Sequence, residues 1–293
     1  MALKLSEAEQ IFIIHGAQQN FRTDGRRCSD FRPLLLETGV SGNTVGSARI
    51  RLGNTDVLVG VKAEVEKPSL SNPDRGAIRF FVDCSANATP AFEGRGGDDI
   101  ALSVASALND SYNNDLFVFD TRLLCIAPNA FSWTLFVDVV LLEMGGSLYD
   151  AASMAVKAAL SSVVIPHVSV THDEKQQPHL ELKDDDVYTT WKLDIGRVPI
   201  IVNVGKLGKS NVVDMTVEEE TCALCCLQVG VTACDPHRVC FLRQDGRGSL
   251  DPESLKEMIN HGTLVGGSLH RSLDDYLKRE QSRTDRRVVG FLS

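Results

Sequence analysis

The chain has 293 residues, of which 43% are hydrophobic and 24% are charged. This length and composition allow one large domain or two modest ones with real cores, and they exclude a chain that is disordered throughout. The net charge of −9 lacks the basic excess of a free-standing nucleic-acid binder, so any such contact has to come from a few local arginines or from a surface that other subunits complete.

The N-terminus and the cysteines indicate a reducing compartment. No apolar run approaches the roughly 20 residues that span a bilayer, and the first 16 residues carry acids and lack the cleavage site of a signal peptide. The eight cysteines are therefore expected to be reduced, buried thiols. Cys222 and Cys225 form a CxxC pair, but without a second pair or two histidines at finger spacing, core packing is favoured over zinc.

The first part of the chain has the pattern of an α+β unit. Ser6 and Glu9 form a capping box ahead of apolar residues at helical spacing, which predicts a first helix. Apolar runs then predict strands at residues 31–37, 46–52, 57–63, 78–83 and 133–142, and the last of these is long enough to predict burial on both faces. Residues 64–75, polar and with two prolines, are expected to form a loop, and helices are expected at residues 97–113 and 149–160.

The fourth predicted strand runs into a polar, glycine-rich turn within residues 80–99, FFVDCSANATPAFEGRGGDD. It places Arg95 between two glycines, with Asp98 and Asp99 at the expected start of the next helix. Glycine lets backbone amides approach a ligand closely, and an arginine can grip a phosphate with a planar fork. The turn has two companions in the chain, RTDGR at residues 22–26 and MGGS at residues 144–147.

The second part of the chain starts after a polar segment at residues 171–186, which is predicted to be a linker between domains 1–186 and 187–293. Strands are predicted at residues 187–193, 200–205, 212–215, 222–232 and 239–243, although the segment that starts at residue 222 is also compatible with a helix. Asp251 and Pro252 then predict a helix start. That helix is expected to run toward Arg279 with an interruption at its glycines.

In this order, the segments at residues 22–26, 80–99 and 144–147 resemble the RNase PH family of 3′→5′ phosphorolytic exoribonucleases, and the resemblance covers nearly the whole chain. Within that family they look most like a ring subunit of the eukaryotic RNA exosome, a subunit type that has lost its active site. The resemblance implies the RNase PH-like α+β fold, which is ribosomal protein S5 domain 2-like. In this fold two similar β-α halves pack as one unit.

The resemblance also implies that the phosphate site is dismantled. Active relatives carry Asp-Gly-Gly-Thr-Arg where a helix opens, so that helix amides and the arginine hold the attacking phosphate. The matching residues here are MGGSL at 144–148, which keep the glycines and a hydroxyl but place Met144 and Leu148 at the acid and the arginine. A leucine cannot make the charge-assisted hydrogen bonds of a guanidinium.

The acids of the family pattern are incomplete as well. Active relatives carry an Asp-Leu-Asp-type strand followed shortly by Glu-Asp, and the matching residues 213–220 keep Asp214 but place Thr216 at the second acid. The three glutamates at residues 218–220 could in principle substitute, but a solvated strand or helix end is the favoured interpretation. Asp98 and Asp99 are interpreted as N-terminal helix acids rather than metal ligands. No catalytic residue, metal or cofactor is therefore expected.

The resulting hypothesis is a non-catalytic structural and RNA-channel subunit of the exosome core. The RNA-binding candidates are Arg95, Arg26 and Arg22, with an ion pair or a subunit contact as the alternative for Arg95. Five more basic residues gather near the C-terminus, where a solvated helix end is favoured: Lys278, Arg279, Arg283, Arg286 and Arg287.

The resemblance implies several partners and no membrane association. They are other RNase PH-like subunits, paired within a six-membered ring, cap proteins with S1 and KH domains, an associated hydrolytic ribonuclease and single-stranded RNA. The implied locations are the nucleus, the nucleolus and the cytoplasm. Two alternatives stay open. The first is an active phosphate-dependent exoribonuclease, against which Leu148 and Thr216 argue. The second is a metabolic α+β enzyme that shares the fold by chance, which the lack of an intact catalytic set disfavours.

Overall fold

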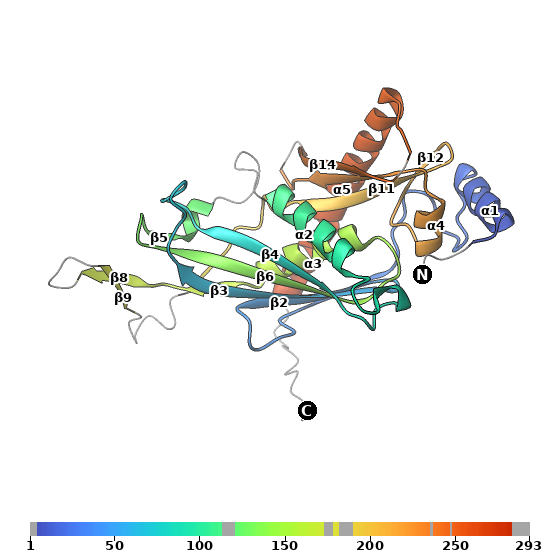
Figure 1. The fold of residues 1–293 in the computed structure, drawn as a ribbon. Coiled ribbons are helices and arrows are strands. Elements are labelled where there is room, and N and C mark those ends of the chain that lie inside the picture. Colours follow the sequence, from blue (N-terminus) through green and yellow to red (C-terminus); the bar gives the residue numbers. More distant parts are fainter. Residues whose placement is uncertain are drawn as a thin grey trace.

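Two β-sheets, with helices between and beside them, make up the fold in the computed structural model (Figure 1). The structure describes residues 5–112, 121–172, 178–181, 190–234, 237–246 and 248–282. The predicted domain boundary at residue 186 lies outside these residues, as do Arg283, Arg286 and Arg287. Within the described part of the chain, no helix is both long and apolar enough to cross a membrane.

The larger sheet belongs to the first half of the chain. Its order is β1-β2-β3-β6-β4, and β5 also pairs with β6. The β4–β6 pair is parallel and the other pairs are antiparallel. The bounds are β1 Leu34–Thr38, β2 Gly46–Leu52, β3 Thr55–Glu66, β4 Ala77–Cys84, β5 Cys125–Ala127 and β6 Phe131–Glu143.

The smaller sheet belongs to the second half and is wholly antiparallel, with the order β12-β11-β13-β14. Two short pairs complete the strands, β7 with β10 and β8 with β9. The bounds are β7 Val164–Pro166, β8 Ser169–His172, β9 Pro178–Glu181, β10 Thr190–Lys192, β11 Ile200–Leu207, β12 Ser210–Val213, β13 Cys226–Val231 and β14 Val239–Asp245.

The helices connect the two sheets. Helix α3 packs on β2 and β3 of the larger sheet and on β11 of the smaller one, whereas α2 packs on β4 and touches β14. Helix α5 covers the smaller sheet, and α1 contacts α4 and the β11–β12 edge (Figure 1). The bounds are α1 Glu7–Gln18, α2 Asp98–Tyr112, α3 Leu148–Ser161, α4 Val217–Cys222 and α5 Pro252–Ser282, with short 3-10 helices at Pro90–Phe92 and Thr121–Leu124.

Most predicted elements are present, because local signals define them. The Ser6–Glu9 capping box begins α1, and Asp98 and Asp99 lie in the first turn of α2. One hydrophobic core includes residues of both halves, from Leu36 in β1 through Leu148 in α3 to Leu273 in α5. The predicted α+β fold of two halves packed as one unit is therefore confirmed.

Three expectations were wrong. Strand β6 alternates buried and half-buried residues, so it is buried on one face only. Strand β3 extends into the expected loop, to Glu66. The predicted linker, which includes parts of the β8–β9 pair, stays a prediction. Helix α5 runs without interruption through its glycines. Gly262 and Gly266 face the sheet, where a side chain would not fit: a Cβ at Gly266 would lie 2.9 Å from Val231.

A buried charged group joins α3 to α5. The side chain of Lys157 is fully buried, with its Nζ 2.6 Å from Asp274 Oδ1 and 2.9 Å from His270 Nδ1. His270 Nε2 lies 2.8 Å from the carbonyl of Val231. The Lys157 ammonium donates to Nδ1, so His270 is neutral and its Nε2–H donates to Val231. Burial, helped by the nearby Lys157 charge, lowers the pKa of His270 to about 4.

This pKa predicts acid sensitivity. Between pH 4 and about 6.5 the unfolded chain protonates His270 and the folded chain does not, so stability falls as pH falls through this range. One proton that only the unfolded chain binds changes the free energy of unfolding by about 1.4 kcal/mol per pH unit. In urea denaturation between pH 4.5 and 7, we expect the free energy of unfolding of His270→Gln to depend less on pH than that of wild type, by up to this slope. His15→Gln, at an exposed position of α1, should keep the pH dependence of wild type. Equal slopes in wild type and His270→Gln would contradict the prediction.

Candidate functional site

The segments that match the family's phosphate and acid motifs meet at one place in the structure. The loop of Gly145, Gly146 and Ser147, which leads into α3, packs on the loop that follows β12 and leads into α4. A Cβ at Gly146, which has φ +92°, would lie 2.3 Å from the carbonyl oxygen of Met215. The glycines of the motif thus allow the two halves of the chain to approach each other closely.

Asp214 is the centre of this contact. It is fully buried with φ +45°, and its carboxylate accepts from Arg26 Nη1 at 2.9 Å and from Arg32 Nη2 at 2.6 Å. The backbone N–H of Arg32 donates to the same carboxylate at 2.6 Å. The Arg32 guanidinium also donates to the carbonyls of Gly145 at 2.6 Å and Gly146 at 3.1 Å. One arginine thereby links the acid motif of the second half to the phosphate motif of the first.

Arg22 makes a second buried ion pair beside the first. Its Nε donates to Glu219 Oε1 at 2.8 Å and its Nη2 donates to Glu219 Oε2. The other donors of the guanidinium reach the carbonyls of Val213 at 3.1 Å, Asp214 at 2.7 Å and Asp30 at 3.4 Å. Burial alone would lower the pKa of Arg22, but the Glu219 carboxylate outweighs it and raises that pKa above its ordinary value.

The RNA-binding candidates differ in their contacts within the chain. Arg22 is 2% exposed and has all five N–H donors occupied, which argues against an RNA contact. Its RNA contact stays a prediction. The side chain of Arg26 is 12% exposed and paired with Asp24 and Asp214, which also argues against an RNA contact. Arg95 is exposed on the loop before α2 and makes no side-chain hydrogen bond or ion pair with another described residue. Its predicted contact stays a prediction.

The remnants of the phosphate motif face inward as well. Leu148 is 3% exposed and belongs to the main hydrophobic core. The backbone N–H of Ser147 donates to Glu220 Oε1 at 2.8 Å, and Ser147 itself is fully buried. Asp150 is fully buried and accepts from the N–H of Asn203 with both oxygens at 3.2 Å. Burial, and then the charge of Asp214, raises the pKa of Asp150 well above its ordinary value.

The solvated-end interpretation of the three glutamates holds only for Glu218, which is exposed. Glu219 is buried against Arg22, and Glu220 is partly buried and accepts from the N–H of Ser147. Burial raises the pKa of Glu220 to about 7. Since the folded chain then holds the proton between pH 4.5 and 7, the contribution of Glu220 to stability decreases as pH rises through this range, opposite in sign to that of His270.

The sequence did contain a signal for this arrangement. Thr216 is the N-cap of α4, and Glu219 is the reciprocal partner in its capping box. The T-x-x-E spacing predicts such a box, and it separates Glu219 from the exposed Glu218. Arg32 was missed altogether, because nothing in its neighbourhood distinguishes it from a strand-edge cation.

The acids of this arrangement are engaged within the chain. The carboxylates of Asp214 and Glu219 are paired with arginines, and Leu148 is buried in the core. In the described part of the chain, no group of three or more His, Cys, Asp or Glu residues is placed to hold a metal ion. What the geometry does is hold the two halves of the chain together.

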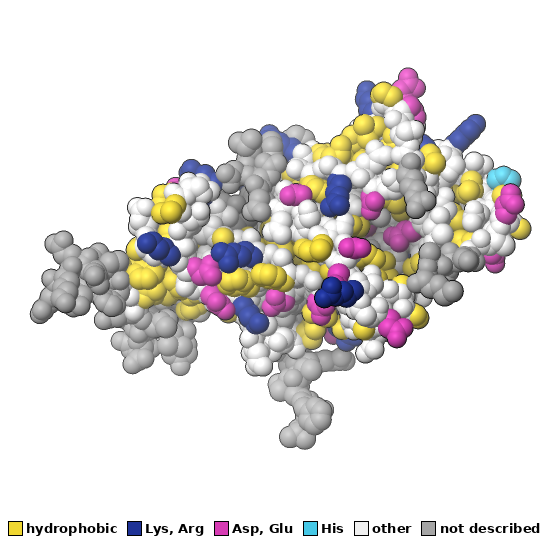
Figure 2. Space-filling model, in the orientation of Figure 1, with side chains coloured by type: hydrophobic (Ala, Val, Ile, Leu, Met, Phe, Trp, Pro, Cys, Tyr) yellow, Lys and Arg dark blue, Asp and Glu magenta, His cyan; other side chains and the backbone are white. Residues whose placement is uncertain are grey.

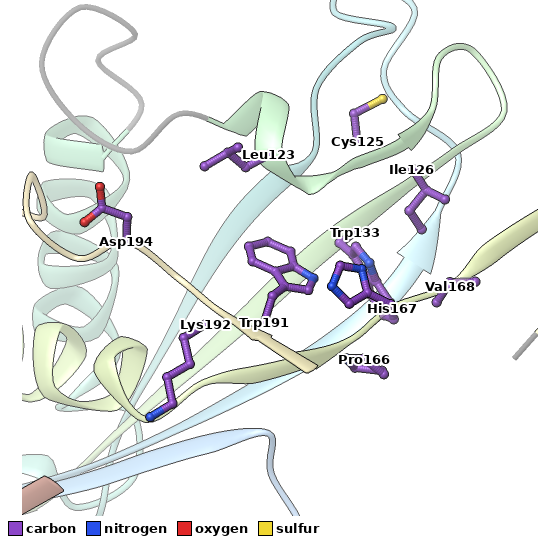
Figure 3. Close-up of a pocket in the computed structure, with 10 residues that line it drawn as sticks. All are labelled: Leu123, Cys125, Ile126, Trp133, Pro166, His167, Val168, Trp191, Lys192 and Asp194. Atoms are coloured by element: carbon purple, nitrogen blue, oxygen red, sulfur yellow. The ribbon is translucent and has the colours of Figure 1, made fainter. Parts of the chain in front are cut away.

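A separate pocket of about 540 Å³ lies where β5 and β6 approach the β7–β10 pair (Figure 3). Trp133, Trp191 and His167 converge on it, and it contains none of the motif residues described above. On the face shown in Figure 2, basic and acidic side chains are interspersed rather than gathered into a basic stripe. This pattern agrees with the net charge of −9.

Two family models match the chain. Domain 1 of the 3′ exoribonuclease family, RNase PH, matches residues 30–166, and domain 2 matches residues 197–263. The chain belongs to the RNase PH family.

Relatives with curated names agree with this membership of the RNase PH family. The chain is 30% identical over 321 residues to the putative exosome complex exonuclease RRP42 of Dictyostelium discoideum, which covers 94% of this chain and 98% of that protein. It is 31% identical over 252 residues to the exosome complex component Rrp42 of Methanopyrus kandleri, with 86% and 90% covered. Among solved structures, it superposes with a TM-score of 0.76 on a chain of the Archaeoglobus fulgidus exosome with RNA bound to the active site, at 26% identity and with 92% and 98% covered. The family resemblance expected from the sequence is confirmed.

The ion pair of Arg22 and Glu219 leads to a stability prediction. Glu219→Ala leaves a buried guanidinium without its counter-charge, which typically costs about 3–5 kcal/mol. Glu218→Ala, one position earlier and exposed, is a matched control that we expect to change stability by less than about 0.5 kcal/mol. Urea denaturation at pH 7.5 compares them. Equal stabilities of the two variants would show that Glu219 is solvated, as the sequence alone suggested.

Proposed function

We propose that this chain is a non-catalytic subunit of an RNA exosome core, in which it forms part of a ring and of the channel for single-stranded RNA. The observation that carries the proposal is the inward orientation of the residues matched to the catalytic motifs. The ion pairs of Arg22 and Arg32 join segments from the two halves of the chain, with Asp214 as the partner of Arg32. Leu148 packs in the hydrophobic core. The relatives named as exosome components support membership of the core.

The loss of activity follows from the needs of phosphorolysis. The attacking phosphate has to be held by charge-assisted donors next to the acids that assist the leaving oxygen. Here Leu148 is apolar and buried, Thr216 serves as a helix cap, and the carboxylate of Asp214 is neutralised by two arginines. No observation in this structure favours the alternative of an active phosphorolytic enzyme.

The proposal extends to partners and location. Other RNase PH-like subunits would flank the chain in a six-membered ring, with S1 and KH proteins as a cap and a separate hydrolytic ribonuclease at the end of the channel. Such a complex would serve rRNA maturation and mRNA turnover in the nucleus, nucleolus and cytoplasm. A channel that grips the RNA backbone through a few cations is compatible with an acidic chain, because only the channel-facing patch has to be positive.

The first test is enzymatic. We expect the purified chain, incubated with single-stranded RNA and inorganic phosphate, to release no nucleoside diphosphates above background. An active RNase PH enzyme under the same conditions is the positive control. Phosphate-dependent release that follows the chain through purification would overturn the proposal that it is non-catalytic and favour the active enzyme.

Arg95 tests the channel. Because a phosphate contact carries no base specificity, Arg95→Ala should weaken RNA binding by the assembled ring about equally for all sequences. The slope of log affinity against log salt should fall by about 0.7, the value for one contact on a single strand. Arg95→Glu should weaken binding further.

The control is Lys256→Glu, which makes the same charge change at an exposed position of α5 in the other half of the chain. Ring assembly is followed by size-exclusion chromatography. If Arg95→Glu binds RNA as well as Lys256→Glu does, Arg95 is not in the channel. If it breaks the ring apart, Arg95 is a subunit contact instead.

A further inference from the structure

The pocket of about 540 Å³ beside β5 and β6 is lined by both tryptophans of the chain. Trp133 belongs to β6 and Trp191 to β10, while His167 directly follows β7. The three rings converge on the pocket (Figure 3). Its volume lies within the range of roughly 300–1,000 Å³ of pockets that hold small molecules, so it is large enough for a nucleobase together with its ribose.

The two indoles are held in place before any ligand arrives. Trp133 and Trp191 are both half-buried, and both pack against the main hydrophobic core. Trp191 is the central residue of β10 and pairs with Ile165 of β7, which is fully buried. Each indole therefore contacts the core and lines the pocket at once. Rings that are ordered in advance lose little conformational freedom when a ligand stacks on them.

The charges around the pocket do not favour a phosphate. Lys192 lines the pocket, but it follows Trp191 along an extended strand and its side chain points away from the two indoles (Figure 3). Asp194 is exposed, and its Oδ1 accepts from the N–H of Gly196 at 2.9 Å. Burial raises the pKa of Cys125, so its thiol is neutral at pH 7. This lining suits a flat, uncharged ligand with amino groups better than a phosphate.

We propose that this pocket, here named the tryptophan pocket, binds an unstacked base of single-stranded RNA. Aromatic side chains stack on any base, because every base has a π-face, and the His167 nitrogens and the Asp194 carboxylate offer polar partners to the edge of the base. The inference rests on the proposed function in taking single-stranded RNA as the ligand, and it adds a base contact to the phosphate contact expected of Arg95. It uses none of the residues matched to the catalytic motifs.

The indole N–H resonances of the full chain report on the tryptophan pocket directly, because the chain has no other tryptophans. We expect a short oligoadenylate to shift both resonances in a saturable way, since the ring current of a stacked base acts on them. An abasic strand with the same number of phosphates should leave them unchanged. Free adenosine should shift the same resonances with lower affinity. Tighter binding of adenosine than of the oligoadenylate would assign the pocket to a free nucleoside and overturn the proposal.

Variants locate the stacked base. With a labelled oligoadenylate in fluorescence anisotropy, we expect Trp191→Ala to weaken binding about ten-fold or more, the usual effect of one lost base–aromatic stack. Trp191→Phe keeps a ring and should keep most of the affinity. His167→Ala removes an exposed ring and should weaken binding, whereas His15→Ala, at an exposed position of α1, is the matched control. Because a stacked base adds no phosphate contact, the slope of log affinity against log salt should be equal in wild type and Trp191→Ala.

Three results would overturn the proposal. They are equal shifts of the indole resonances by the abasic strand, no shift by the oligoadenylate, and unchanged affinity in Trp191→Ala. The second result would leave the pocket to an apolar side chain of a protein partner. If circular dichroism shows that Trp191→Ala does not fold, His167→Ala and the wild-type resonances decide. None of these results changes the outcome of the phosphorolysis test or of the Arg95 test, which measure the proposed function separately.

Discussion

The structure depends on the pairing of buried arginines with two acids of the second half, Asp214 and Glu219. An unpaired charge at either place would be strongly destabilising, because burial removes the solvation that water provides and only a well-placed partner restores it. The partners come from residues 22–32, ahead of the first strand, so the N-terminal segment cannot dock without the second sheet being in place. Since Arg32 also holds the carbonyls before α3, the same interaction sets the position of that helix.

Helix α3 uses this position to complete the second sheet. Strand β12 pairs with β11 only from Val204 onward, which leaves the earlier backbone groups of β11 without a strand partner on that side. Side chains of α3 take its place: the hydroxyl of Ser153 bonds both the N–H and the carbonyl of Ile201, and Asp150 accepts from the N–H of Asn203. Buried backbone groups need hydrogen-bond partners. The side chains of α3 supply these partners to β11 where β12 does not pair with it, and the small residues of α3 let the helix lie close to β11.

These two arrangements hold the two halves of the chain in the family's fold. The charges of Arg26, Arg32 and Asp214 neutralise one another, and the apolar Leu148 adds to the core. Burial of a charge next to a matched partner fixes the geometry of both groups, because either charge alone would be strongly destabilising.

The sequence by itself determined the elements that local physics defines. Capping boxes, alternating apolar runs and an Asp-Pro helix start depend on neighbours within a few residues, so α1, β2, α3 and the start of α5 could be predicted closely.

Only the tertiary structure decided which charges are free. Arg22, Arg26 and Arg95 are alike as sequence features, each an arginine beside glycine or a turn. Their roles separate only when Asp214 and Glu219, nearly two hundred residues further along the chain from Arg22, arrive as partners for the first two and not for the third. The burial of Glu219 and Glu220 beside the exposed Glu218, and the continuity of α5 through its glycines, have the same origin. Burial and ion pairing depend on what packs against a residue from a distant part of the chain, and no local pattern carries that information.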